Sequence, residues 1–149
     1  MRAFWTIVGA VLLAGCSLDT TFEPPVQYVW HGEMVGAPGW ENIQGNAALV
    51  WTTGRAQFIA SIGIQGDQPY ELRLWHVHQG TCETGGPMLG FPGDYDDLLI
   101  NENGTAETDV LIREALNPNR SYYVDIHLSD LSAATTVIAC ADTVLETDS

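Results

Sequence analysis

The chain contains no lysine, and five arginines are its only permanently basic side chains, against 19 acidic residues. The formal net charge of −14 argues against nucleic acid and anionic lipid headgroups as partners, because both carry charge of the same sign. No run of 12 residues keeps a helical period, so a helical domain is not expected. Cysteine is scarce too, with three residues and no C-x-x-C pair.

The longest apolar run lies at the N-terminus. Residues 3–13 form an apolar segment that is too short to cross a bilayer as a helix, and Arg2 precedes it. The segment Leu13-Ala14-Gly15-Cys16 then resembles the lipobox of bacterial lipoproteins, in which the cysteine thiol accepts a diacylglycerol. The alternative is an ordinary signal peptide with a chance cysteine.

This segment predicts where the protein resides. Residues 1–15 are expected to be a cleaved lipoprotein signal peptide, and acyl chains on Cys16 are expected to anchor the mature chain in the membrane. Ser17 follows the cysteine, instead of the aspartate associated with inner-membrane retention. The expected location is therefore the bacterial cell envelope, at the outer membrane, facing the periplasm or the cell surface. Residues 16–26 are interpreted as a lipidated tether.

The mature chain has 134 residues from Cys16 onward and a formal charge of −15, enough for one domain at 27–149. Its short alternating runs, separated by turn residues, are typical of strands. They predict an all-β fold, an antiparallel Greek-key β-sandwich or barrel of seven to eight strands, without a helix longer than about two turns. The strands are expected near residues 27–35, 46–53, 55–64, 70–78, 105–113, 121–128 and 134–141, with a weak one near 97–101.

The region 79–97 is the longest stretch without a strand pattern. Loops of this length in a compact domain are usually functional or mobile. Three acidic residues at its end fit either a calcium site or a solvated loop; they are Asp94, Asp96 and Asp97.

Two cysteines remain once Cys16 is assigned to the lipid. Cys82 and Cys140 then form an even pair in an oxidising compartment, which predicts a disulfide. Two thiolates that bind a metal ion are the alternative.

Three of the four histidines lie in two of the expected strands. His76 and His78 point to the same side of one strand, and His127 lies on the polar face of another. An H-x-H pair places two imidazoles ~6–7 Å apart at Cα, which suits two ligands of one metal ion. Solvated or hydrogen-bonded strand histidines are the alternative. His31 is either a fourth ligand or an ordinary strand residue.

Several segments, in order over roughly residues 46–141, resemble copper/zinc superoxide dismutases. The segment 74–82, Leu-Trp-His-Val-His-Gln-Gly-Thr-Cys, resembles the strand with the H-V-H copper motif, which leads into the disulfide loop. Residues 124–131 are similar to the strand that carries a further copper-ligating histidine, and residues 137–140 to the strand with the second disulfide cysteine. The resemblance implies copper ligation by His76, His78 and His127, and a disulfide between Cys82 and Cys140.

The chain also departs from that family. Residues 83–97 contain no histidine, so the bridging histidine is absent and no zinc site of the family type is expected. Val137 stands where the family has its active-site arginine. Asp125 and Asp130 are close to His127 in the sequence, and both are candidates to orient a metal-binding histidine by accepting a hydrogen bond from its other ring nitrogen.

A second resemblance fits nearly as well. CHRD-type domains carry an H-I-H-x-G string followed by Gly-Pro, and a strand that ends in V-x-V-H. Residues 76–80, 85–87 and 123–127 are similar to these pieces. Those domains lack the cysteine pair, and both resemblances imply the same kind of β-sandwich.

Three functional hypotheses follow. The first is a copper-only, dismutase-like oxidoreductase that turns over superoxide. The second is a non-catalytic copper binder that stores or passes on the metal in the periplasm, with a copper-donating protein as its partner. The third is a CHRD-like envelope interaction module with vestigial histidines. Because the bridging histidine and the active-site arginine are missing, we expect copper binding with weak or no dismutase activity.

Overall fold

The computed structural model describes residues 24–129 and 136–146. The predictions for the signal peptide, for the Cys16 anchor and for Asp130 concern positions outside these ranges. Within them, no helix is both long and apolar enough to cross a membrane.

The described residues form eight antiparallel strands and a single turn of 3-10 helix, which confirms the all-β prediction. The predicted strand positions agree with the structure to within a few residues at most ends. The largest difference is the last strand, which continues to Leu145 because it pairs there with the first strand. The elements are β1 (Gln27–Gly36), β2 (Gln44–Thr52), β3 (Phe58–Gln65), β4 (Leu72–Gln79), η1 (Pro92–Asp94), β5 (Leu98–Leu99), β6 (Ala106–Ile112), β7 (Tyr122–Leu128) and β8 (Val137–Leu145).

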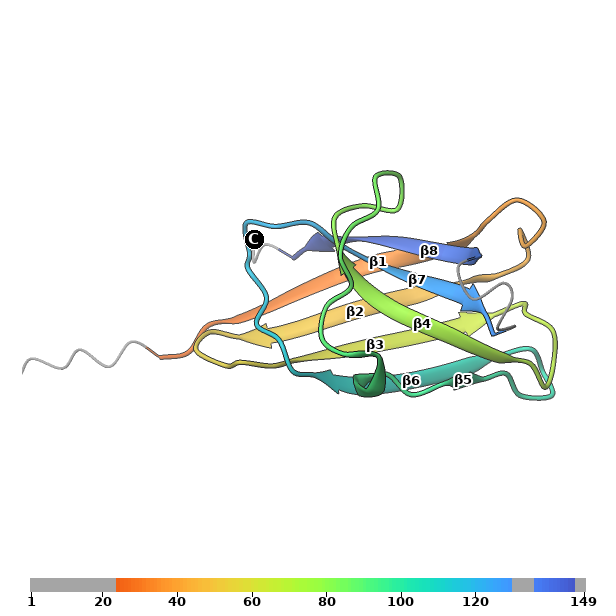
Figure 1. Cartoon of the computed structure of the whole chain (residues 1–149), viewed down its shortest axis with the longest axis horizontal. Coiled ribbons are helices and arrows are strands. Elements are labelled where there is room, and N and C mark those ends of the chain that lie inside the picture. Colours follow the sequence, from red (N-terminus) through yellow and green to blue (C-terminus); the bar gives the residue numbers. More distant parts are fainter. Residues whose placement is uncertain (1–23, 130–135, 147–149) are drawn as a thin grey trace, which may run out of the picture.

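One sheet in the order β5-β4-β7-β8-β1-β2-β3-β6 curls into a nearly closed barrel (Figure 1). β1, β2 and β3 form a meander, whereas the chain crosses from β3 to β4 and from β6 to β7, as in a Greek key. These two crossings bring β4 and β7 side by side. The predicted histidine strands are therefore neighbours in the sheet.

Alternation along each strand builds the core. Apolar residues at every second position face the barrel interior, and the largest of them are almost completely buried. In β4 these residues are Trp75 and Val77, and in β7 they are Val124 and Ile126. The side chains between them therefore lie on the outer face of the barrel.

The segment between β4 and β5, residues 80–97, lies over this outer face. Its first part returns along β4, where Leu89 N–H donates to Val77 O at 2.8 Å and Gln79 N–H donates to Pro87 O at 3.0 Å. The predicted disulfide joins Cys82 to Cys140 of β8 with Cα atoms 6.0 Å apart, inside the usual range. In Figure 1 this segment rises beside β8 and then descends to η1, next to β6.

Candidate metal centre

The register of β4 against β7 brings the candidate residues to one place. His76 pairs with Asp125, and His127 lies opposite Leu74, one position further along the same face. Because side chains at every second position point the same way, His76, His78, Asp125 and His127 share the outer face of this strand pair. One ligand atom from each of these four residues lies within 4.8 Å of the others.

This face is covered, although it lies outside the barrel. Asp125 is 3% exposed and His127 is 9% exposed, so β7 is buried on both of its faces. Part of the cover is the segment after β4, which places Gly86 beside His78. The charged groups of the cluster are therefore largely removed from water, where an unpaired polar atom is costly.

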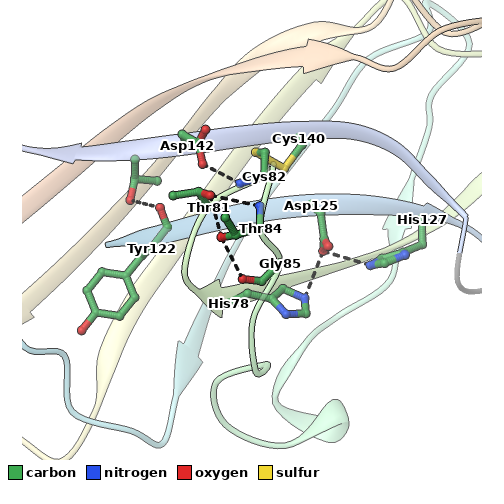
Figure 2. Close-up of a disulfide and its surroundings, with 11 residues drawn as sticks. His78, Thr81, Cys82, Thr84, Gly85, Tyr122, Asp125, His127, Cys140 and Asp142 are labelled. Carbon is green, nitrogen blue, oxygen red and sulfur yellow. Dashed lines mark hydrogen bonds and ion pairs between the residues drawn. A yellow bond between two sulfur atoms is a disulfide. The ribbon is translucent and has the colours of Figure 1, made fainter. Parts of the chain in front are cut away.

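Asp125 lies between two of the histidines (Figure 2). His127 Nε2 lies 2.9 Å from Asp125 Oδ1 and forms a hydrogen bond with it. His78 Nε2 lies 3.3 Å from the same oxygen, an ion-pair distance at which the hydrogen-bond geometry is not met. An ionised carboxylate only accepts hydrogen bonds, so Nε2 of His127 carries the proton in this pair.

The second contact of His78 fixes its tautomer as well. His78 Nδ1 lies 3.0 Å from Gly86 O, and a carbonyl oxygen only accepts, so Nδ1–H is the donor. The lone pair of a neutral His78 is then on Nε2, beside the Asp125 carboxylate. Two electron-rich atoms at this distance repel each other unless a cation, either a proton or a metal ion, lies between or beside them.

Two buried nitrogens in the described residues lack a hydrogen-bond partner, and both belong to this cluster. They are His78 Nε2 and His127 Nδ1. In each ring the other nitrogen is held by an oxygen, which is how protein histidines are oriented when their free nitrogen binds a metal. Buried polar atoms are rarely left unpaired, and a bound ion is one of the recognised explanations when they are.

The dimensions of the cluster fit a metal ion after a small contraction. Imidazole nitrogens bind at ~2.0–2.1 Å, so two of them on one ion lie at most ~4.2 Å apart. The ligand atoms of the cluster are within 4.8 Å of one another. Three or four ligands cannot all lie on opposite sides of one ion, so the widest of these separations must shorten by more than ~0.6 Å when an ion binds. The four residues can therefore hold a metal ion.

The protonation equilibria in the cluster reflect burial and the central carboxylate. Burial, together with the charge of His127, lowers the pKa of His76. Burial also acts to lower the pKa of His78, but Asp125 and the Gly86 carbonyl outweigh it and the pKa is raised. For Asp125, burial is outweighed by the hydrogen bond from His127 and by the nearby charges of His127 and His78, which hold its pKa at about 2.

Two tyrosines orient the histidine rings. The Tyr123 ring stacks on His78 with centroids 4.8 Å apart, and the Tyr95 ring meets the edge of His76 at 5.1 Å. Tyr95 Oη donates to Leu89 O at 2.8 Å and accepts from Val77 N–H at 3.1 Å, which fixes this ring between β4 and the segment that covers it.

The structure brings the three predicted histidines and Asp125 together. It does not bring His31 to them: this residue lies in β1 and contacts Glu146 at 3.2 Å. Asp94 forms an ion pair with Arg113 at 3.0 Å. Val137 lies opposite His127 in the β7–β8 ladder, so the position that carries an arginine in the resembled family is next to the cluster and apolar.

Sequence reasoning did not identify Gly86 or Tyr95 as part of the site. The Gly85-Gly86-Pro87 string was a visible signal, because a glycine pair beside a metal motif often marks a close backbone approach. Tyr95 gave no signal of its own, since its contacts depend on how residues 80–97 fold back over β4.

Comparison of the chain with protein-family models and with curated proteins found no match.

Proposed function

We propose that this protein is an envelope lipoprotein whose β-barrel domain binds copper through His76, His78 and His127, with weak or no superoxide dismutase activity. The observation that carries the proposal is the pair of buried, unpartnered nitrogens on His78 and His127, in a cluster that also contains His76. The envelope location and the lipid anchor rest on the lipobox-like segment that ends at Cys16.

Copper is favoured over other divalent metals by the donor set. Imidazole nitrogens suit copper, zinc and nickel, and Cu²⁺ has the highest affinity in the series for such sites. Asp125 is proposed to orient His127 through the Nε2–H hydrogen bond and to balance the positive charge of the ion. When bound, the copper ion would supply one-electron redox chemistry.

Efficient dismutation is not expected from this chain. Residues 83–97 contain no histidine, so this segment offers no bridging imidazole. Val137 lies opposite His127, at the position where the resembled family has its arginine. In the part of the chain that the structure describes, the histidines of the cluster form ion pairs with Asp125 and none of the four residues pairs with an arginine. Without a guanidinium at the site, superoxide has no evident partner to attract it.

The test is a copper titration of the full chain in detergent, followed by electron paramagnetic resonance and by a superoxide assay. His127→Ala should weaken Cu²⁺ binding by at least about tenfold, which is the lower end of the loss seen even for outer-shell partners. His31→Ala is the matched control, because His31 lies in β1 outside the cluster. The Cu²⁺ affinity of this variant should equal that of the wild type.

Three results would contradict the proposal in different ways. Equal Cu²⁺ affinity of His127→Ala and wild type would show that the site is wrong, and absence of binding in both would favour the interaction module. Superoxide turnover near the diffusion limit would be compatible with the copper site but would refute the prediction of weak or no dismutase activity.

A further inference from the structure

A small cavity of about 310 Å³ lies against the His76 side of the cluster. Its walls come from β4 and from the segment that folds back over it. Among its lining residues are the His76 and Tyr95 rings, the Met88 side chain, and two exposed acidic residues, Asp96 and Asp97. No arginine lines it, so the cavity presents negative charge and soft or aromatic groups beside an imidazole.

Met88 reaches this cavity through regular strand pairing. It forms an antiparallel bridge with His78, flanked by the hydrogen bonds Leu89 N–H to Val77 O and Gln79 N–H to Pro87 O. This pattern makes His78 and Met88 a non-hydrogen-bonded pair, the type in which opposite Cα atoms are ~4.5 Å apart and the side chains are closest. Directly opposite residues point to the same side, so Met88 lies on the face that carries the histidines.

The position of Met88 brings its thioether to the side of β4 that carries His76 and His78. Thioether sulfur is a soft donor that selects Cu⁺ over harder divalent ions, whereas imidazole binds either oxidation state of copper. The unbranched Met side chain adapts its shape easily, and Met88 is only partly buried and lines an open cavity. Asp96 and Asp97 line the cavity and give it a negative charge that attracts cations.

We propose that Met88 is a further ligand of this site, specific for the cuprous ion, which it binds together with His76 and His78. The cavity beside His76 is then the entrance through which Cu⁺ arrives. This inference rests on the proposed copper function, and it adds an oxidation state and a donor atom to it. The other described methionine, Met34, is 2% exposed in the barrel core and cannot take this place.

The experiment compares wild type with Met88→Leu, a substitution that keeps the volume and the apolar character and removes the sulfur. The full chain is titrated with Cu⁺ against a competing chelator, with Ag⁺ as a redox-inert substitute, and separately with Cu²⁺. Met88→Leu should bind Cu⁺ and Ag⁺ at least about tenfold more weakly and Cu²⁺ within about twofold of wild type. X-ray absorption should show a sulfur neighbour of Cu⁺ in the wild type that is missing in Met88→Leu.

Phe91→Leu is the control, because it changes an exposed side chain of the same segment and removes no donor atom. Unchanged Cu⁺ affinity in Met88→Leu would overturn the role of Met88 and leave the histidine site standing. An equal loss for Cu⁺ and Cu²⁺ would also overturn it, since Met88 would then act only through packing. If the wild type binds copper in neither oxidation state, the proposed function itself fails.

Discussion

Asp125 interacts with two of the three histidines of the cluster. Its Oδ1 accepts the hydrogen bond of His127 and lies 3.3 Å from His78 Nε2. Asp125→Asn keeps the shape and removes the charge. We expect it to lower Cu²⁺ affinity about 10–100-fold, the usual effect of losing a carboxylate that orients a metal-binding histidine. Asp109→Asn is the control, because Asp109 is exposed on β6, and isothermal titration with copper compares the two variants.

Asp125→Asn should also change the pKa of His78 in the metal-free protein. In the wild type the pKa of His78 is raised, with Asp125 as the main cause that opposes burial. A raised pKa stabilises the folded state below the ordinary imidazole value of ~6.5, and this stabilisation is lost as the pH rises through the folded-state pKa. Nuclear magnetic resonance titration should place His78 above His76 in the wild type and should lower the His78 value in Asp125→Asn. A His78 pKa that stays unchanged in that variant would mean that Asp125 does not interact with its charge.

At the scale of elements, the segment after β4 completes the site from outside the barrel. Its Gly86 carbonyl accepts the Nδ1–H of His78, and the Gly86 Cα lies so close to Gln79 O that a Cβ would collide with this backbone atom. Gly86→Ala should therefore push the segment away from β4, free the His78 ring and weaken copper binding by at least about tenfold. Gly93→Ala, in the same segment, meets nothing within 4 Å and should leave binding unchanged.

Copper affinity and the free energy of unfolding of these two glycine variants can be measured side by side. Equal affinity in both would show that the segment only covers the site and does not position His78. A loss in Gly93→Ala as large as in Gly86→Ala would point to a general loosening of the segment.

The strands were predictable and the covering segment was not. A strand with one face in the core reveals itself by alternation, which is why Trp75 and Val77 located the inner face of β4 and, with it, the outward direction of His76 and His78. His127 was expected on the polar face of its strand, yet both faces of β7 are buried. Part of the cover is the segment 80–97, whose path depends on a bridge at Met88, a disulfide at Cys82 and contacts of Tyr95, none of which leaves a periodic signal.

On the scale of the whole molecule, the Greek-key crossings make the site possible. His76 and His127 are about 50 positions apart in the chain, and only the adjacency of β4 and β7 brings them together. The disulfide then ties the covering segment to β8 across a sequence separation of 58 residues. By the chain-entropy argument it contributes roughly 4 kcal/mol to the stability of this arrangement.

The net charge of the whole chain sets how an anion approaches the site. The 19 acidic residues outnumber the arginines, so superoxide is repelled unless a local positive group compensates. Dissolved salt screens this repulsion, with a screening length of ~10 Å at 0.1 M. We therefore expect any superoxide consumption by the copper-loaded chain to rise with ionic strength, measured at constant pH between low and physiological salt.

Val137→Arg tests the same electrostatic argument by adding a positive charge next to the cluster. Val137 is 38% exposed and lies opposite His127, so a guanidinium there has room to reach water and the cluster. It should raise the rate of superoxide consumption at low salt and should turn the salt dependence downward, because added salt then screens an attraction. If the wild-type rate falls as salt is added, a positive local field already exists at the site, and the expectation of weak dismutase activity loses its electrostatic basis.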